Sequence, residues 1–293
     1  MDCAVDQARP THLTSCIGFS AVFGPYLVLL LNKSCAIPTL LVRQKGNAKV
    51  QELKQITASD FELASCQASV FTPDGGFSAA KILKLFYPQQ SVVFDASPMV
   101  LPVPEDAPFE IPRIIFESAS HEWKCQLSPV RVDVIWTRTK STQTKLSIGD
   151  FFRKAGEVLI QYADVLGTRV ARVAGVAKRF CEHEAPGIYL ARHFCKERWD
   201  SAPLNRPENF ELHAHKTFLL ANEFQVNSWA RCKTGLLAES APPKPIVMFE
   251  QDMNTLAEAA TDKDFQAEEV KRFLLAVAKE ADVILRLYFP NPR

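Results

Sequence analysis

Apolar and polar positions alternate with a period of two along much of the chain beyond residue 61, a pattern typical of strands with one buried face. The alternation predicts single strands at 62–71, 91–96, 209–221, 225–238 and 242–253, and two or three strands within 113–139. Residues 168–180 fit a helix or a strand, and their β-branched side chains favour the strand. These strands are grouped and do not alternate strictly with helices.

Apolar residues spaced three or four apart predict helices between these groups. Ser78 is placed to cap a helix over 79–87, which Pro88 is expected to end. A second helix covers 151–166, and Gly167 follows it as a C-terminal stop.

Two more helices are predicted in the second half of the chain. One begins near Pro186, and the other is a long amphipathic helix capped by Asp262 or Asp264. The buried stripe of this last helix is expected to be Val270, Phe273, Leu274, Val277, Ala281, Ile284 and Leu285.

This order of elements predicts an α+β protein. We expect an antiparallel sheet with helices packed on one face and a long C-terminal amphipathic helix. Residues 61–293 form the α+β domain, with a strand-rich front at 61–147 and a mixed back at 148–293. Residues 1–60 are assigned to a hydrophobic N-terminal extension. No internal repeat is visible in the sequence.

The extension contains an uncharged run at 13–32, long enough to reach across a bilayer. Gly24 and Pro25 interrupt it, and a proline in mid-run breaks a helix. The flanking IGFSAVF and YLVLLL therefore favour two short strands. A membrane-associated helix and a processed signal segment stay open as alternatives.

Composition limits the classes of function. The chain has 293 residues, of which 47% are hydrophobic, so it can bury a large core. The net charge of +1 gives no global attraction to nucleic acid or anionic lipid, and such binding would need a local patch. The 8 cysteines are irregularly spaced without a CxxC pair, which favours reduced thiols in the cytoplasm. No nucleotide- or cofactor-binding motif is present, so no cofactor is expected.

One group of residues has the right chemistry for zinc. Cys181, His183, His193 and Cys195 offer two sulfurs and two nitrogens, the ligand set of many tetrahedral sites. The single-residue spacers argue against it, because positions i and i+2 diverge on a helix and alternate positions of a strand face opposite ways. Two buried thiols and two surface histidines are the competing interpretation.

Two smaller groups lie on predicted strands. His213 and His215 would share one strand face with Glu211 and could hold a metal or act with a carboxylate. Glu250 and Asp252 flank one residue on a late strand and could chelate magnesium. Solvated surface side chains are the competing interpretation for both groups.

A local basic face is the basis for a nucleic-acid hypothesis. Its candidate contacts are Arg169, Arg172, Lys178, Arg179 and Arg192, and Tyr189 and Trp199 could stack on bases. Nearby carboxylates at Glu182, Glu184, Glu197 and Asp200 instead favour a solvated surface of mixed charge.

Several segments resemble a sporadically distributed family of bacterial proteins of unknown function. They are VFTPDGGF (70–77), LFYP (85–88), EIPRIIFES (110–118), SPVRVDVIW (128–136), TRVARVAGV (168–176), PIVMFEQDM (245–253) and the final helix at 267–289. The resemblance covers about residues 64–290 and leaves 1–60 outside. It implies an accessory role, in a mobile or defence-related operon, and it implies no catalytic residues.

The sequence thus leads to three hypotheses of function. The first is a non-enzymatic cytoplasmic subunit that binds another protein or a second copy of itself. The second is a nucleic-acid-binding or nuclease-like protein that uses the basic region at 169–198. The third is a metal-dependent hydrolase built on the histidine pairs.

Overall fold

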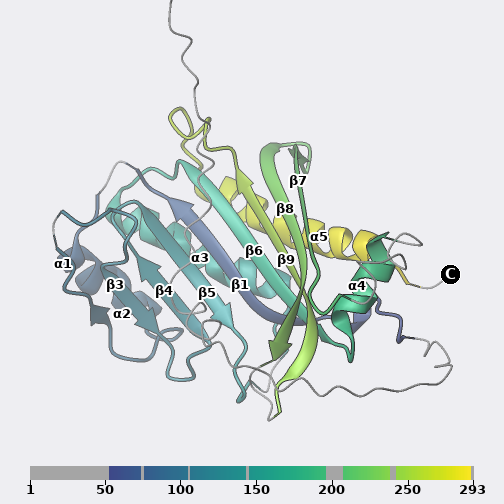
Figure 1. Cartoon of the computed structure of the whole chain (residues 1–293). Coiled ribbons are helices and arrows are strands. Elements are labelled where there is room, and N and C mark those ends of the chain that lie inside the picture. Colours follow the sequence, from purple (N-terminus) through teal and green to yellow (C-terminus); the bar gives the residue numbers. More distant parts are fainter. Residues whose placement is uncertain are drawn as a thin grey trace, which may run out of the picture. The chain divides into compact units, whose positions relative to one another are not determined.

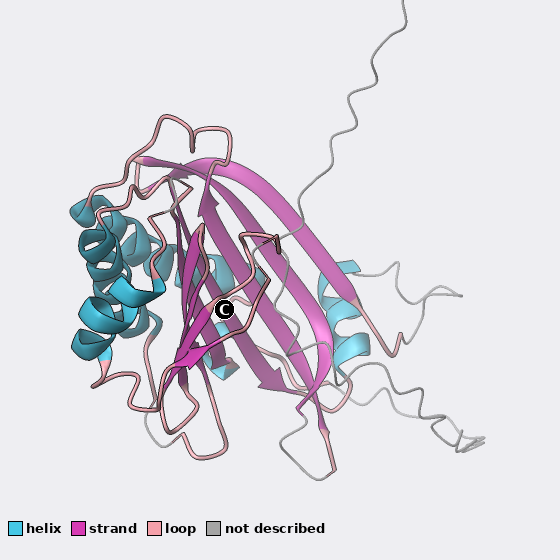
Figure 2. Ribbon diagram, turned by 90° about the vertical axis from the view of Figure 1, so that its left-hand side faces the viewer, coloured by secondary structure: helices cyan, strands magenta, loops and turns pink. Residues whose placement is uncertain are grey.

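The computed structural model describes residues 53–73, 76–104, 106–142, 145–195, 207–237 and 242–291. They contain an antiparallel sheet with the strand order β2-β3-β4-β5-β1-β6-β9-β8-β7. The long helices lie on one face of this curved sheet (Figures 1 and 2). The predicted α+β class is confirmed.

The strands are β1 (Glu62–Phe71), β2 (Met99–Val100), β3 (Ile114–Glu117), β4 (Trp123–Leu127), β5 (Arg131–Thr137), β6 (Arg172–Glu182), β7 (Glu211–Leu220), β8 (Phe224–Leu237) and β9 (Lys244–Thr255). The helical segments are η1 (Ala58–Asp60), α1 (Ala79–Lys81), the π-helical η2 (Ile82–Phe86), α2 (Tyr87–Gln90), α3 (Ile148–Leu166), α4 (Pro186–Cys195) and α5 (Ala267–Tyr288).

The chain repeats one topology, although no repeat is visible in the sequence. The first half runs from β1 through the α1–α2 segment to β3, β4, β5 and α3, and the second from β6 through α4 to β7, β8, β9 and α5. Read outward from the centre, the strands are β1-β5-β4-β3 on one side and β6-β9-β8-β7 on the other. Because β1 and β6 pair antiparallel, the two halves are related by an approximate two-fold axis between them.

The central core lies between the sheet and the helices α3 and α5, which pack against each other. Gly156 of α3 lies where an added Cβ would meet Leu274 of α5 at 3.3 Å. The space beside Gly175 of β6 is smaller still, because an added Cβ there would lie 2.9 Å from both Phe152 and Val277. The two glycines therefore allow the central helices and the sheet to approach closely.

Residues 53–60, which the sequence assigned to the extension, pack on this domain. Ile56 is fully buried, and both its N–H and its carbonyl bond to the Tyr189 hydroxyl. The Ala58 N–H donates to the carbonyl of Phe289. The predicted boundary at residue 60 is therefore wrong by several residues, because backbone pairing with distant elements holds this segment in place. The uncharged run at 13–32 lies outside the described residues.

Several local predictions are confirmed. Residues 172–182 form a strand, so the ambiguous 168–180 segment is resolved in favour of β6. The Ser78 hydroxyl accepts from the Lys81 N–H, and Gly167 ends α3 in the left-handed region with φ 66°. All seven residues of the predicted α5 stripe are buried.

Other local predictions are wrong. Residues 91–96 form no strand, since the Phe94 N–H instead donates to the Gln90 carbonyl at the end of the preceding helix. Pro88 does not end that helix, because the π-helical turn η2 before it shifts the pairing and the helix continues to Gln90. Neither Asp262 nor Asp264 caps α5, where Gln266 and Glu269 form a capping box.

None of the helices in the described ranges is both long enough and apolar enough to cross a membrane.

Candidate functional site

The sheet face opposite α3 and α5 is lined by polar and charged side chains, and we call it the open face. On β5, Val132 and Val134 are buried toward the helices, whereas Arg131 and Asp133 point the other way. The strand register extends this alternation across the sheet. The charged residues that share the open face include Glu117, Lys124, Arg131, Asp133, Arg172, Lys178, Glu182, Glu211, Arg231, Lys233, Lys244, Glu250 and Asp252.

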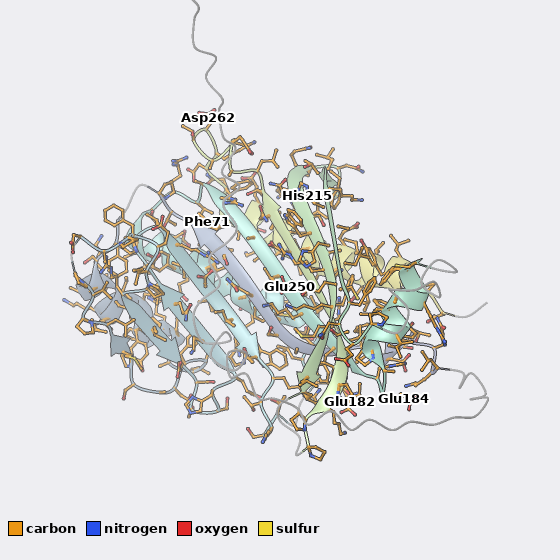
Figure 3. All side chains as sticks on the ribbon, viewed as in Figure 1. Phe71, Glu182, Glu184, His215, Glu250 and Asp262 are labelled. Carbon is orange, nitrogen blue, oxygen red and sulfur yellow. The ribbon has the colours of Figure 1, made fainter. Side chains whose placement is uncertain are left out.

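Positive and negative groups alternate on this face, and most lie within reach of an opposite charge. Figure 3 shows Phe71, Glu250 and His215 at separate points along the face. The Arg131 Nε donates to Asp133 at 2.8 Å, and Asp133 also accepts from the Ser69 hydroxyl and, at 3.0 Å, from the Gln67 amide. One carboxylate oxygen of Asp133, Oδ1, is therefore bound by neighbours on β1 and β5.

A second cluster is centred on Glu250 of β9. Its carboxylate lies 3.1 Å from the Lys178 Nζ and 2.6 Å from the Arg231 Nη1. Burial would raise the pKa of Glu250, but Lys178 and Arg231 outweigh it and hold the pKa below its ordinary value. The neighbouring Asp252 accepts from the Asn254 amide, and burial raises its pKa.

The predicted magnesium pair is thus occupied by the protein's own groups. Glu250 is already paired with the Lys178 ammonium and the Arg231 guanidinium, so a metal ion would have to compete with both for its carboxylate. The Asp252 carboxylate likewise lies 3.8 Å from the Arg231 Nη1. The structure does not support the proposed chelation.

Two aromatic side chains, Phe71 and Trp229, lie among the charged residues of the open face. Trp229 of β8 lies beneath the His215 imidazole, with ring centroids 4.4 Å apart, and beside the Arg231 guanidinium at 5.2 Å. Phe71 of β1 lies between Arg131 and Arg172, whose guanidinium carbons are 5.0 and 4.9 Å from the ring centroid. Each is a cation–π arrangement that holds an arginine over an aromatic ring.

The histidine pair of β7 shares the open face, as predicted. The His213 Nε2 lies 4.0 Å from a Glu211 carboxylate oxygen, and the His215 Nε2 bonds to the Asn227 amide oxygen at 3.3 Å. The two imidazoles therefore have separate partners. In the described ranges, no three His, Cys, Asp or Glu side chains are grouped as a metal site would require.

The zinc candidates are not brought together. The His183 Nδ1 accepts from the Ala185 N–H, so its Nε2 donates to the Lys54 carbonyl at 3.1 Å. The His193 Nε2 donates to the Tyr288 carbonyl at 2.6 Å. Cys181 is buried, whereas Cys195 is exposed at the end of α4. The His183 imidazole thus connects the end of β6 to residue 54, and the His193 imidazole connects α4 to the end of α5.

The basic residues of the nucleic-acid hypothesis do not share one face. Arg179 points toward the helices, is 5% exposed, and donates to Gln251 and Asp282. Arg169 lies in the linker between α3 and β6, where it donates to the carbonyls of Ala260, Thr261 and Lys263. Arg172 and Lys178 lie on the open face, and Arg192 is in α4. The predicted basic surface at 169–198 is therefore divided among separate parts of the fold.

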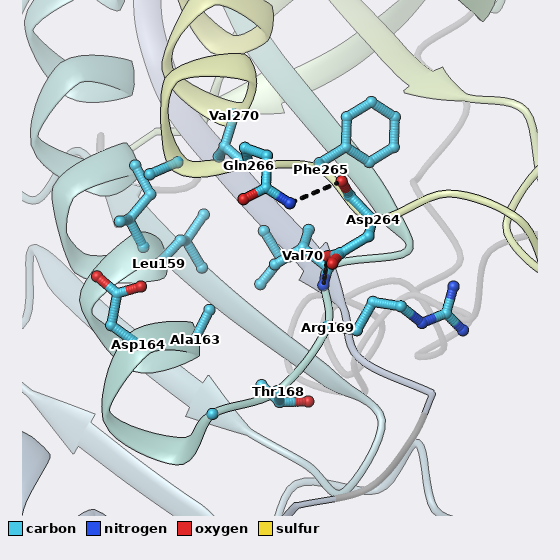
Figure 4. A pocket seen from close by; sticks show the side chains of 14 residues that line it. Val70, Leu159, Ala163, Asp164, Thr168, Arg169, Asp264, Phe265, Gln266 and Val270 are labelled. Atoms are coloured by element: carbon cyan, nitrogen blue, oxygen red, sulfur yellow. Dashed lines mark hydrogen bonds between the residues drawn. The ribbon is translucent and has the colours of Figure 1, made fainter.

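A cavity of about 450 Å³ lies where the two halves of the chain join. Its walls come from the end of α3, the linker to β6 and the start of α5 (Figure 4). Asp264 accepts from the Val170 N–H at 3.4 Å, while the buried Thr168 hydroxyl has no partner in the described part of the chain. The lining of the cavity is more polar than apolar, and the hydrogen bonds described there join the linker to the segment before α5.

Sequence reasoning missed most of the open face. Phe71, Arg131, Asp133, Trp229 and Arg231 belong to it, and none was a candidate. Alternation within β5 and β8 showed which residues share a face of each strand, but only the pairing of distant strands places them side by side.

No known protein-family model matches the chain. No curated protein matches it either.

Proposed function

We propose that the chain is a non-enzymatic binding subunit whose open face docks onto a protein partner. The observation that carries this proposal is the mixture of charged and aromatic side chains across the open face of the sheet. Protein surfaces of mixed charge complement such a mixture, whereas a polyanion would meet Asp133, Glu250 and Asp252 as well as the cations.

The aromatic groups support the same function. Trp and Arg are enriched among the residues that contribute most to protein–protein binding. Trp229 and Arg231 lie together on this face, and ion pairs already fix the geometry of Arg231. A partner would therefore meet side chains that lose little conformational freedom on binding.

The cellular setting belongs to the same proposal. We infer a cytoplasmic protein from the irregular cysteine spacing and from the buried thiols of Cys66, Cys125, Cys181 and Cys232. Membership of the bacterial family of unknown function, with an accessory role in a mobile or defence-related operon, also stays a prediction. Nucleic-acid binding and metal-dependent hydrolysis are the alternatives.

The test uses the full chain as bait in cells of its source, with cross-linking before purification. Trp229→Ala should release the partner, with affinity reduced about tenfold or more for a central aromatic contact. Leu287→Ala is the matched control, because Leu287 is an exposed apolar residue on α5, in the helical layer. Cross-links to α5 instead of β8 and β9, or retention of the partner by Trp229→Ala, would contradict the proposal.

A further inference from the structure

Arg172 differs from the other arginines of the open face in its partners. Its Nε donates to the Thr255 carbonyl at 2.9 Å, and its Nη2 donates to the Asn254 amide oxygen at 2.6 Å. Both acceptors are neutral, and within the described residues Arg172 makes no ion pair. By contrast, Arg131 is paired with Asp133 and Arg231 with Glu250.

The surroundings make this charge unfavourable in the free protein. Burial lowers the pKa of Arg172 below its ordinary value; Asp252 opposes this effect, Arg131 adds to it, and Glu258 opposes it again. A partly buried cation whose direct acceptors are all neutral is costly, because it has lost water and the opposite charges near it, Asp252 and Glu258, do not outweigh that loss. An incoming anion would supply an opposite charge.

The geometry is prepared for such an anion. Phe71 of β1 lies between the guanidinium groups of Arg172 on β6 and Arg131 on β5. The hydrogen bonds described for each arginine use its Nε and Nη2, so the Nη1 groups keep donors for a ligand. Both arginines are fixed before binding, which reduces the entropy lost on association.

We propose that Arg172, with Arg131 across Phe71, receives a carboxylate from an Asp or Glu side chain of the protein partner. This inference rests on the proposed function of the open face. A carboxylate fits better than a polyphosphate chain, because Asp133 lies within the same cluster and Asp252 is close enough to act on Arg172. A single acid brings one negative charge near those carboxylates, whereas a polyphosphate chain would bring several.

The test measures side-chain Nε–H signals of the ¹⁵N-labelled full chain by NMR. The probes are a short peptide of alternating glutamate and serine, the same peptide with glutamine for glutamate, and a short single-stranded oligonucleotide. The glutamate peptide should shift the Arg172 signal saturably, and the glutamine peptide should not. The signal is identified by its loss in Arg172→Gln.

Arg138→Gln is the matched control, because Arg138 also lies over a phenylalanine ring, Phe180, but is already paired with Glu62. Arg172→Gln should weaken peptide binding about tenfold or more, whereas Arg138→Gln should leave it nearly unchanged. No saturable shift with the glutamate peptide, an equal shift with the glutamine peptide, or tighter binding of the oligonucleotide would each overturn the proposal.

The cross-linking test separates this inference from the function on which it rests. A partner that Trp229→Ala releases, but that Arg172→Gln retains at full affinity, would overturn the carboxylate subsite and leave the docking function standing. A partner that neither variant releases would count against both.

Discussion

Gly175→Ala tests the close approach of the sheet to the two central helices. The added Cβ would lie 2.9 Å from Cε1 and Cζ of Phe152 in α3 and 2.9 Å from Cγ1 of Val277 in α5. Carbon atoms in good contact are about 3.5–4.0 Å apart, so the methyl group has no room. Phe152 and Val277 are each 1% exposed, and neither can move its side chain into solvent.

The expected cost follows from this overlap. One methyl group too many in a close-packed core costs about 1–3 kcal/mol. Replacing glycine also lowers the entropy of the unfolded chain, which returns about 0.4–1 kcal/mol. We therefore expect a net loss of about 1–2 kcal/mol in the free energy of unfolding, and a fall in Tm of about 2–4 °C per kcal/mol for a domain of this size. Urea unfolding followed by circular dichroism measures the first quantity, and calorimetry the second.

Two further variants show whether the cause is steric. Gly149→Ala is the control, because a Cβ in the first turn of α3 would meet nothing closer than the Ser147 hydroxyl at 3.9 Å. It should leave stability unchanged or raise it by up to about 1 kcal/mol. Val277→Ala should reduce the cost of Gly175→Ala, because it removes one of the two overlaps. If Gly175→Ala unfolds at the wild-type urea concentration, or costs the same with and without Val277, the packing argument is wrong.

Three more predictions concern the charged and thiol groups. Because the pKa of Glu250 is lowered in the folded chain, its ionised carboxylate stabilises the fold at neutral pH, and this contribution is lost as the pH falls below about 4.5. Glu250→Gln should therefore reduce the slope of unfolding free energy against pH in the acid range. An unchanged slope would contradict the assignment. Arg179→Met should cost about 1–3 kcal/mol in urea unfolding, because it leaves the buried side-chain amide oxygen Oε1 of Gln251 without its donor. A neutral or stabilising outcome would refute this role. Iodoacetamide applied to the native chain should modify the exposed Cys195 but spare Cys66, because burial raises the pKa of the Cys66 thiol. Peptide mass mapping measures the modification of both residues. Rapid labelling of Cys66 would show that reagent reaches β1 and would contradict its burial.

Local patterns were sufficient for most elements and for the class of the fold. Ser78 and Gly167 mark helix ends through hydrogen bonding and φ preference within one turn of chain, and both predictions are confirmed. The α5 stripe follows from helical spacing alone. Pro88 and residues 91–96 were misread because a π-helical turn and a buried Phe94 override the local preference.

Local sequence patterns do not show which distant parts of the chain pack together. The topological repeat needs no similarity between the two halves, because different side chains can fill equivalent places in a core. Residues 53–60 carry no strong local signal, and bonds to distant groups tie them to the domain: the Tyr189 hydroxyl, the Phe289 carbonyl and the His183 imidazole.

The sequence by itself determined which residues alternate on each strand and where most helices begin and end, because these features depend on interactions between near neighbours. Only the tertiary structure decided that Phe71 lies between Arg131 and Arg172, which are far from it in the sequence but aligned with it by strand register. A shift of one residue in either pairing would turn these side chains to the other face of the sheet, and register is fixed by the packing of the whole core.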